Sequence, residues 1–131
     1  MDALTKLLAE QAITRLLIQY CADNDACDWE AVAATYVADG RMSRPSDPEH
    51  FIEGRAAILA AFQARPARQS RHVVANILVD VIDPAKAEAT SQLLLFTEPR
   101  AAPLVGSYHD RLVRTEAGWR FRERRGRLDF E

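Results

Sequence analysis

The hydrophobic pattern of the chain changes once, near residue 71, and this change limits the possible folds more than any other feature. Before it, apolar residues recur at steps of three and four, which is typical of amphipathic helices. After it come four long strand-like segments, separated by the turn sequences DPA, EPRAAP and EAG. These segments cover residues 71–82, 86–97, 104–115 and 118–130. Helices followed by a run of strands predict an α+β fold, with the helices on one face of an antiparallel sheet.

Three helices are expected before this change. The first, capped by Asp2, should run to about Asp23, and the second should start at the N-cap Asp28 and run to about Ala38. The third should cover residues 55–65 and stop before a proline. Between the second and third helices, GRMSR predicts a short polar strand, and PSDPEH predicts a loop because its two prolines break regular structure.

Length and charge exclude several classes of function. A chain of 131 residues, 48% of them hydrophobic, is expected to form one domain over residues 1–131. Its net charge of −2 gives no field that would attract nucleic acid or an anionic membrane. Strand alternation also divides the arginines of RFRERRGR between two faces. No secretory signal and no apolar run of about 20 residues is present, so a cytoplasmic protein is expected.

The first strand segment is expected to be covered on both faces. One of its alternating sets is uniformly apolar, whereas the other, which starts at His72, is mixed. The apolar set is Val73, Ala75, Ile77, Val79 and Val81. One face would pack on the chain's own helices and the other on a second subunit. A homo-oligomer, dimer or trimer, is therefore expected to form through the convex face of the sheet.

The sequence QYCADNDACDWEA, residues 19–31, places four acidic residues at the junction of the first two helices. Three explanations compete for them: a solvated linker, a helix cap, or a catalytic acid at the mouth of a pocket. Asp28 has the position of an N-cap. The local pattern leaves Asp25 open between a catalytic group and an ordinary helix-end aspartate that binds nearby backbone amides.

Four stretches, in this order, resemble the SnoaL-like branch of the nuclear-transport-factor-like fold. They are YCADNDACDWEAVAATYVADG, EGRAAILAAF, RHVVANILVDV and YHDRLVRTEAGWRF, and together they span nearly the whole chain. The branch includes polyketide cyclases, scytalone dehydratase and hexachlorocyclohexane dehydrochlorinase. The resemblance implies a cone, in which a curved sheet wraps around the N-terminal helices and encloses an apolar pocket. It also implies an acid/base dyad formed by Asp25 and His72.

The implied dyad suggests chemistry that needs neither a cofactor nor a metal. A carboxylate bonded to one imidazole nitrogen fixes the tautomer, so Asp25 should raise the pKa of His72 above about 6.5 unless desolvation masks the effect. The other nitrogen can then exchange a proton with the substrate, with His72 as the base. Such a pair suits elimination, isomerisation or cyclisation of a small, mostly apolar, cyclic or polyketide-like molecule. A dehydratase-like lyase or isomerase is the function that the resemblance implies.

Six further residues match pocket positions of the family. They are Tyr20, Met42, Ser91, Leu93, Tyr108 and Arg124. Tyr20, Tyr108 and Arg124 would polarise or position an oxygen of the substrate. Ser91 stands where the dehydratase has a second histidine, so that enzyme's own reaction does not transfer. Simple alternation puts Arg124 opposite Trp119 and Phe121, so a β-bulge would be needed for Arg124 to reach the pocket if Trp119 faces it. The sequence leaves open which face Arg124 takes.

Two other functions stay open at this point. The first is a non-catalytic ligand-binding or assembly domain of the same fold, like the β subunit of aromatic-ring dioxygenases. A pocket filled by its own side chains, or an Asp25 that points away from His72, would favour this function. The second is a ketosteroid-isomerase-like enzyme, for which Asp110 is the one obvious candidate acid.

Overall fold

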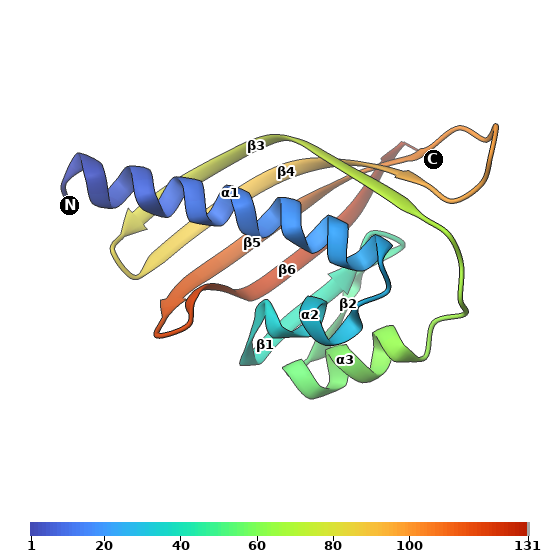
Figure 1. Cartoon of the computed structure of the whole chain (residues 1–131), viewed down its shortest axis with the longest axis horizontal. Coiled ribbons are helices and arrows are strands. Elements are labelled where there is room, and N and C mark those ends of the chain that lie inside the picture. The colour runs from blue at the N-terminus through green and yellow to red at the C-terminus, as the bar shows by residue number, and fades with distance from the viewer. Residues whose placement is uncertain (131) are drawn as a thin grey trace.

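The computed structural model describes residues 1–130, which form three helices and six strands (Figure 1). In chain order these are α1 (Ala3–Asp25), α2 (Trp29–Ala34), β1 (Tyr36–Arg44), β2 (Asp47–Glu53), α3 (Arg55–Gln63), β3 (Arg71–Asp83), β4 (Lys86–Phe96), β5 (Leu104–Thr115) and β6 (Gly118–Phe130). The last residue of the expected domain, Glu131, lies outside the described residues. The α1 helix crosses one face of a curved sheet, while α2 and α3 lie beside β1 (Figure 1). This arrangement confirms the expected α+β class.

The sheet has the strand order β2-β1-β6-β5-β4-β3. The run from β3 to β6 is antiparallel throughout, as its short turns predict. The pair formed by β1 and β6 is parallel, because no hairpin connects these two strands and their relative direction is set by packing instead. The curved sheet is therefore extended beyond β6 by β1, a strand that comes from the N-terminal part of the chain, where the helices lie.

Both expected N-caps are present. The Asp2 carboxylate accepts a hydrogen bond from the Thr5 amide at 2.7 Å, and the Asp28 carboxylate accepts one from the Ala31 amide at 3.2 Å. The face of α1 that packs on the sheet is buried. Its buried residues are Ala9, Ile13, Leu17, Tyr20, Cys21 and Asn24. Within residues 1–130, no helix is both long enough and apolar enough to cross a membrane.

The second helix is shorter than the sequence predicts. It ends at Ala34 rather than near Ala38, and β1 begins at Tyr36. The Thr35 carbonyl accepts a hydrogen bond from the Phe121 amide at 2.7 Å, which draws the chain into the sheet. Tyr36 is fully buried and lies opposite Phe121 in the β1–β6 register. The prediction was wrong here because packing against β6 overrides the local helical pattern.

The sequence PSDPEH forms a hairpin turn and the start of a strand, not the expected loop. Pro45 and Ser46 make the turn, and β2 starts at Asp47 and includes Pro48. The β2 strand lies at the edge of the sheet, where a residue without an N–H can avoid interrupting the ladder. Pro48 is therefore compatible with a strand because β2 lies at the edge of the sheet, and the local sequence does not reveal this position.

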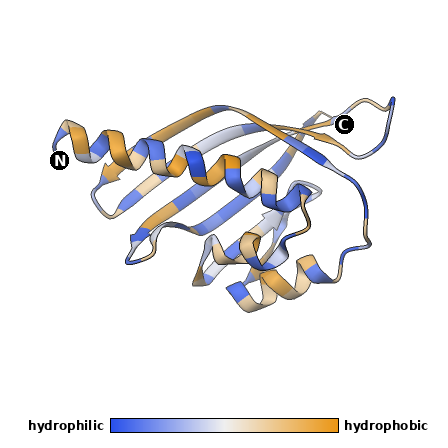
Figure 2. Cartoon of the chain, viewed as in Figure 1, coloured by the Kyte–Doolittle hydropathy of each residue, from blue (hydrophilic) through white to orange (hydrophobic). Residues whose placement is uncertain are grey.

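A β-bulge in β3 overturns the predicted division of its faces. Ala75 pairs with Gln92 and Leu78 pairs with Thr90, so β3 has one residue more than β4 between these pairs. Asn76 sits in this bulge with φ = 50°, a conformation that asparagine adopts more readily than most residues. The concave face of β3 carries His72 and Val74 before the bulge, and Ile77, Val79 and Val81 after it. The long apolar run of β3, orange in Figure 2, thus places apolar side chains on both faces of the sheet.

A second bulge, in β6, brings Arg124 to the concave face, which decides the question that the sequence left open. Leu112 pairs with Phe121, but the preceding residue of β5 pairs with Glu123, so Arg122 is the extra residue. Trp119, Phe121 and Arg124 are therefore all buried on the same face of the sheet.

Candidate active site

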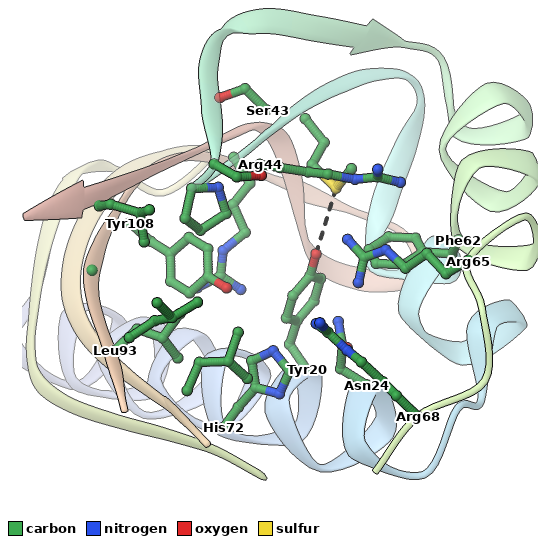
Figure 3. A pocket seen from close by; sticks show the side chains of 18 of the residues that line it. Tyr20, Asn24, Ser43, Arg44, Phe62, Arg65, Arg68, His72, Leu93 and Tyr108 are labelled. Atoms are coloured by element: carbon green, nitrogen blue, oxygen red, sulfur yellow. Dashed lines mark hydrogen bonds between the residues drawn. The ribbon is translucent and has the colours of Figure 1, made fainter. Parts of the chain in front are cut away.

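A cavity of about 390 Å³ lies on the concave side of the sheet (Figure 3). Its apolar wall consists of Phe62, Leu93, Leu95, Leu104 and Leu128. Its polar and charged lining comprises Tyr20, Asn24, Ser43, Arg44, Ser46, Arg65, Arg68, His72, Tyr108 and Arg124. The volume and the mixed lining are those of a site for a small molecule.

Asp25 and His72 meet at the rim of this cavity, where α1 ends and β3 begins. The Asp25 Oδ1 atom lies 2.5 Å from His72 Nδ1. The His72 backbone N–H also donates to Asp25, at 2.9 Å to Oδ2, and the Ser70 hydroxyl donates to Oδ1 at 3.1 Å. Because Asp25 engages Nδ1, the nitrogen of His72 left for a ligand is Nε2. His72 lines the cavity, whereas Asp25 lies behind it.

Burial lowers the pKa of His72 below its ordinary value of 6.5. The hydrogen bond and the charge of Asp25 act in the opposite direction but do not outweigh desolvation, since only 6% of the His72 side chain is exposed. Nearby Arg65 and Arg68 lower the pKa further. Asp25 thus acts to raise the pKa, as the sequence predicted, but desolvation masks this effect, which was the stated exception. The ring is held neutral at neutral pH, which is the protonation state that a base requires.

Arg124 is fully buried in the inner wall of the cavity. Its Nε lies 3.3 Å from Oδ1 of the equally buried Asp110, an ion pair without a well-aligned hydrogen bond. Its guanidinium carbon lies 3.6 Å from the ring centre of Tyr108 and 4.3 Å from that of Tyr20. The terminal nitrogens of Arg124 have no hydrogen-bond acceptor among residues 1–130. A buried cation with unpaired donors therefore lies in the inner wall of the cavity, packed against the rings of Tyr108 and Tyr20.

Burial raises the pKa of Asp110 to about 7, although the charge of Arg124 opposes this shift. Asp110 does not belong to the cavity lining, and its carboxylate is fully buried beside Arg124. It is therefore a poor match for the acid of a ketosteroid-isomerase-like site.

Tyr20, which lines the cavity, contacts Tyr36, a residue that the sequence analysis did not place near the site. The hydroxyls of Tyr20 and Tyr36 lie 3.0 Å apart. The Tyr20 hydroxyl also contacts the Met42 sulfur at 3.8 Å, the contact dashed in Figure 3. Burial raises the pKa values of Tyr20, Tyr36 and Tyr108, so all three phenols stay protonated and can donate. Tyr36 was missed because its sequence pattern placed it in the second helix.

The structure brings most of the predicted pocket residues together. Tyr20, Met42, Leu93, Tyr108 and Arg124 all line the cavity with His72. Ser91 does not, because its short side chain is buried in β4, opposite Tyr108 in the register. The cavity is open and is not filled by its own side chains. A filled pocket would have favoured the non-catalytic domain, so this observation agrees with the expectation for an enzyme.

Three arginines of the lining were not predicted: Arg44, Arg65 and Arg68. Arg44 ends β1 and donates to the Ala61 carbonyl at 3.1 Å. Arg65 lies over the Phe62 ring, with its guanidinium carbon 4.4 Å from the ring centre. The only signal was the sequence QARPARQSR between the third helix and the first long strand, which repeats arginine at short intervals. Which arginines of this segment face the cavity depends on the path of the loop between α3 and β3, and that path is set by the fold.

Comparison with known proteins supports the fold over almost the full length of the chain. A candidate scytalone dehydratase from Novosphingobium aromaticivorans DSM 12444 is 27% identical, with a TM-score of 0.86, covering 98% of this chain and 89% of the other. An NTF2-like protein with a cystatin-like fold from the same species is 25% identical, with a TM-score of 0.85, covering 96% and 85%.

A hexachlorocyclohexane dehydrochlorinase, LinA-type3 from Novosphingobium barchaimii LL02, shares the fold at 15% identity, with a TM-score of 0.84 and coverage of 98% and 92%. No curated protein sequence matches this chain. The family model for the SnoaL-like domain matches residues 5–125, so the chain belongs to the SnoaL-like family.

Proposed function

We propose that the protein is a cofactor-independent acid/base enzyme that acts on a small molecule with a largely apolar body. His72 is the base, and Asp25 is the residue that positions it. The observation that carries this proposal is the contact between Asp25 and Nδ1 of a buried His72 that lines an open cavity. Membership of a family with enzymes among its structural neighbours supports the same conclusion.

The proposed reaction starts with removal of a proton from a carbon beside an electron-withdrawing group. His72 Nε2 takes the proton, and the C–H electron pair forms a new π bond. In an elimination, the leaving group departs from the next carbon with its bonding electrons, and the imidazolium can return the proton to a leaving oxygen as water. In an isomerisation, the proton returns to a different carbon. Asp25 stabilises the imidazolium that forms in between.

Charge that develops on a substrate oxygen needs a donor at the opposite wall. Arg124 supplies unpaired N–H groups there, and the protonated hydroxyls of Tyr20 and Tyr108 lie next to it. Donors fixed in a buried site before the reaction stabilise such charge without having to reorganise. We therefore assign these residues to positioning and polarising the oxygen.

Hydrogen–deuterium exchange tests this proposal and does not require the product to be identified. Small cyclic ketones would be incubated with the protein in D₂O, and loss of the α-proton signal would be followed by NMR. The wild-type protein should accelerate exchange, and His72→Gln should reduce the acceleration by roughly 10²–10⁴. Exchange that is equal with and without the protein, or unaffected by His72→Gln, would favour the non-catalytic binding domain.

We also propose that the chain forms a homo-oligomer through the convex face of the sheet. This face carries exposed apolar side chains, and a second hollow of about 700 Å³ lies on it. The exposed apolar residues are Val73, Leu78, Ile82, Leu94, Phe96 and Phe130. The charged residues that border this hollow, Arg127 and Asp129, already pair with each other at 3.4 Å. An apolar face of this kind without net charge suits a second copy of the same face.

A further inference from the structure

We propose that the substrate is a carboxylic acid, whose carboxylate binds to Arg44, Arg65 and Arg68 while its apolar body lies against the leucines of the opposite wall. This inference rests on the proposed function of the same cavity and names its substrate class. It differs from the sequence-based expectation of a mostly apolar molecule, because the three arginines were not recognised as cavity residues.

The three arginines come from two segments that converge on one side of the cavity. Arg44 ends β1, and Arg65 and Arg68 lie in the segment between α3 and β3. All three line the cavity. Figure 3 shows Arg65 and Arg68 on one side, with their guanidinium groups directed into the open space, and Tyr108 and Leu93 on the other side. The cavity is therefore cationic on one side and largely apolar on the other.

These charges have no counter-ion in the part of the chain that the structure describes. No carboxylate oxygen of residues 1–130 lies within 4.0 Å of Arg44, Arg65 or Arg68, and no acidic residue belongs to the cavity lining. Six of the twelve other arginines have such a partner: Arg41, Arg71, Arg122, Arg124, Arg125 and Arg127. The remaining six have none either among the described residues, but they do not line the cavity, so the cluster is distinguished by its three unpaired charges around one enclosed space. With a formal net charge of −2 for the whole chain, this positive cluster is a local feature rather than a result of composition.

The cluster is also close enough for its members to repel one another. Burial lowers the pKa of Arg65, and the charges of Arg44 and Arg68 lower it further. The Nε of Arg44 is buried and has no acceptor among the described residues. An anion placed between these groups would relieve the repulsion and supply the missing acceptor. A carboxylate fits because its two oxygens match the planar fork of a guanidinium group.

The same cluster acts on the proposed base. Arg65 and Arg68 both lower the pKa of His72. A bound carboxylate would neutralise part of their field, so the pKa of His72 should rise when the acid binds. His72 would then become a stronger base only in the occupied site, which couples recognition of the acid to proton removal.

Matched pairs of acids and amides test the proposal. The probes are benzoate with benzamide, cyclohexanecarboxylate with its amide, and naphthoate with its amide. Binding would be followed by the His72 ring resonances and by the fluorescence of Trp29, which stacks on the cavity residue Phe62 with ring centres 5.2 Å apart. Each acid should bind about tenfold more tightly than its amide at low salt, and this preference should shrink as salt increases.

Single variants assign the preference to the arginines. Arg65→Gln and Arg68→Gln should each weaken binding of the acids about tenfold and leave binding of the amides unchanged. Arg15→Gln is the matched control, since it removes one exposed positive charge from α1, away from the cavity, and should change neither. Acid binding should also raise the pKa of His72 in the wild-type protein.

The proposal is overturned if the acids bind no more tightly than their amides, or if Arg15→Gln weakens acid binding as much as Arg65→Gln does. Tighter binding of inorganic phosphate than of every acid would also overturn it, in favour of a phosphorylated ligand. His72→Gln separates this proposal from the proposed function. Acid binding that survives in His72→Gln, with proton exchange unchanged by that variant, would reject the catalytic role and keep the acid site.

Discussion

The carboxylate of Asp25 accepts hydrogen bonds from the backbone of His72 while it also contacts the ring nitrogen Nδ1 of the same residue. This double contact joins the last residue of α1 to the second residue of β3, across 47 positions of sequence. The Asp25 carboxylate thus holds both the backbone and the side chain of His72, which restricts the orientation of the imidazole ring toward the cavity.

Asp28, which follows Asp25 at the same junction, caps α2, and its removal should affect stability alone. Asp28→Ala removes the side-chain acceptor of the Ala31 amide at the start of α2. We expect the free energy of unfolding to fall by about 0.5–2 kcal/mol, measured by urea denaturation. The titration of His72 should stay unchanged.

Asp28→Asn provides the control, because asparagine is an equally good N-cap. It should retain most of the stability that Asp28→Ala loses. A shift of the His72 pKa in either variant would show that Asp28 belongs to the site after all.

The buried pair of Arg124 and Asp110 should show strong coupling. Arg124→Leu leaves the Asp110 carboxylate buried without its partner and should lower the free energy of unfolding by about 3–5 kcal/mol. The double variant Arg124→Leu/Asp110→Leu removes both charges and should recover most of this loss. Denaturation of Arg124→Leu, Asp110→Leu and the double variant gives the coupling energy between the two side chains. Additive losses would mean that the two charges do not interact.

Stability should depend on pH through His72. Because the pKa of the folded state lies below 6.5, the unfolded chain binds a proton at His72 before the folded protein does. The contribution of His72 to stability should therefore fall as the pH drops below about 6.5, until His72 protonates in the folded state too. Asp110, whose pKa is raised to about 7, acts in the opposite direction over the same range, so the effect of His72 is obtained by comparison with a variant. The slope of unfolding free energy against pH should be less positive in His72→Gln than in the wild-type protein in this window. Equal slopes in the two proteins would contradict a lowered pKa.

Association should depend on the convex face of the sheet. Leu78 is 72% exposed on this face, so Leu78→Glu should leave the fold intact and reduce the molar mass measured by light scattering. Leu4→Glu is the control, because Leu4 is 64% exposed but lies on α1. A wild-type protein that is a monomer, or an oligomer that survives Leu78→Glu, would contradict the proposed interface.

Features that depend on neighbouring residues could be predicted from the sequence. The caps Asp2 and Asp28 could be identified because each one satisfies amides only three residues away. The four C-terminal strands were predictable from alternation and short turns. The need for a bulge at Arg124 could be recognised, because the register of the family and simple alternation put this residue on opposite faces, but the sequence did not decide between the two faces.

Features that depend on distant packing could not be predicted. Tyr36 enters a strand because β6 lies beside it, and Pro48 is tolerated because β2 is an edge strand. The bulge at Asn76 exchanges the faces of β3 without any proline or glycine to mark it. Arg65 and Arg68 reach the cavity through a loop whose path is set by its anchors, α3 and β3. Whether desolvation would outweigh the effect of Asp25 on the pKa of His72 could not be predicted either, because burial is a property of the whole fold.

The most direct test of the proposed acid/base site is the titration of the His72 ring by NMR, in the wild-type protein and in Asp25→Asn. We expect a pKa below 6.5 in the wild-type protein and a still lower pKa in Asp25→Asn, because the substitution removes the group that favours the protonated ring. Identical titration curves in the two proteins would contradict the dyad, and the binding-domain function would then be preferred.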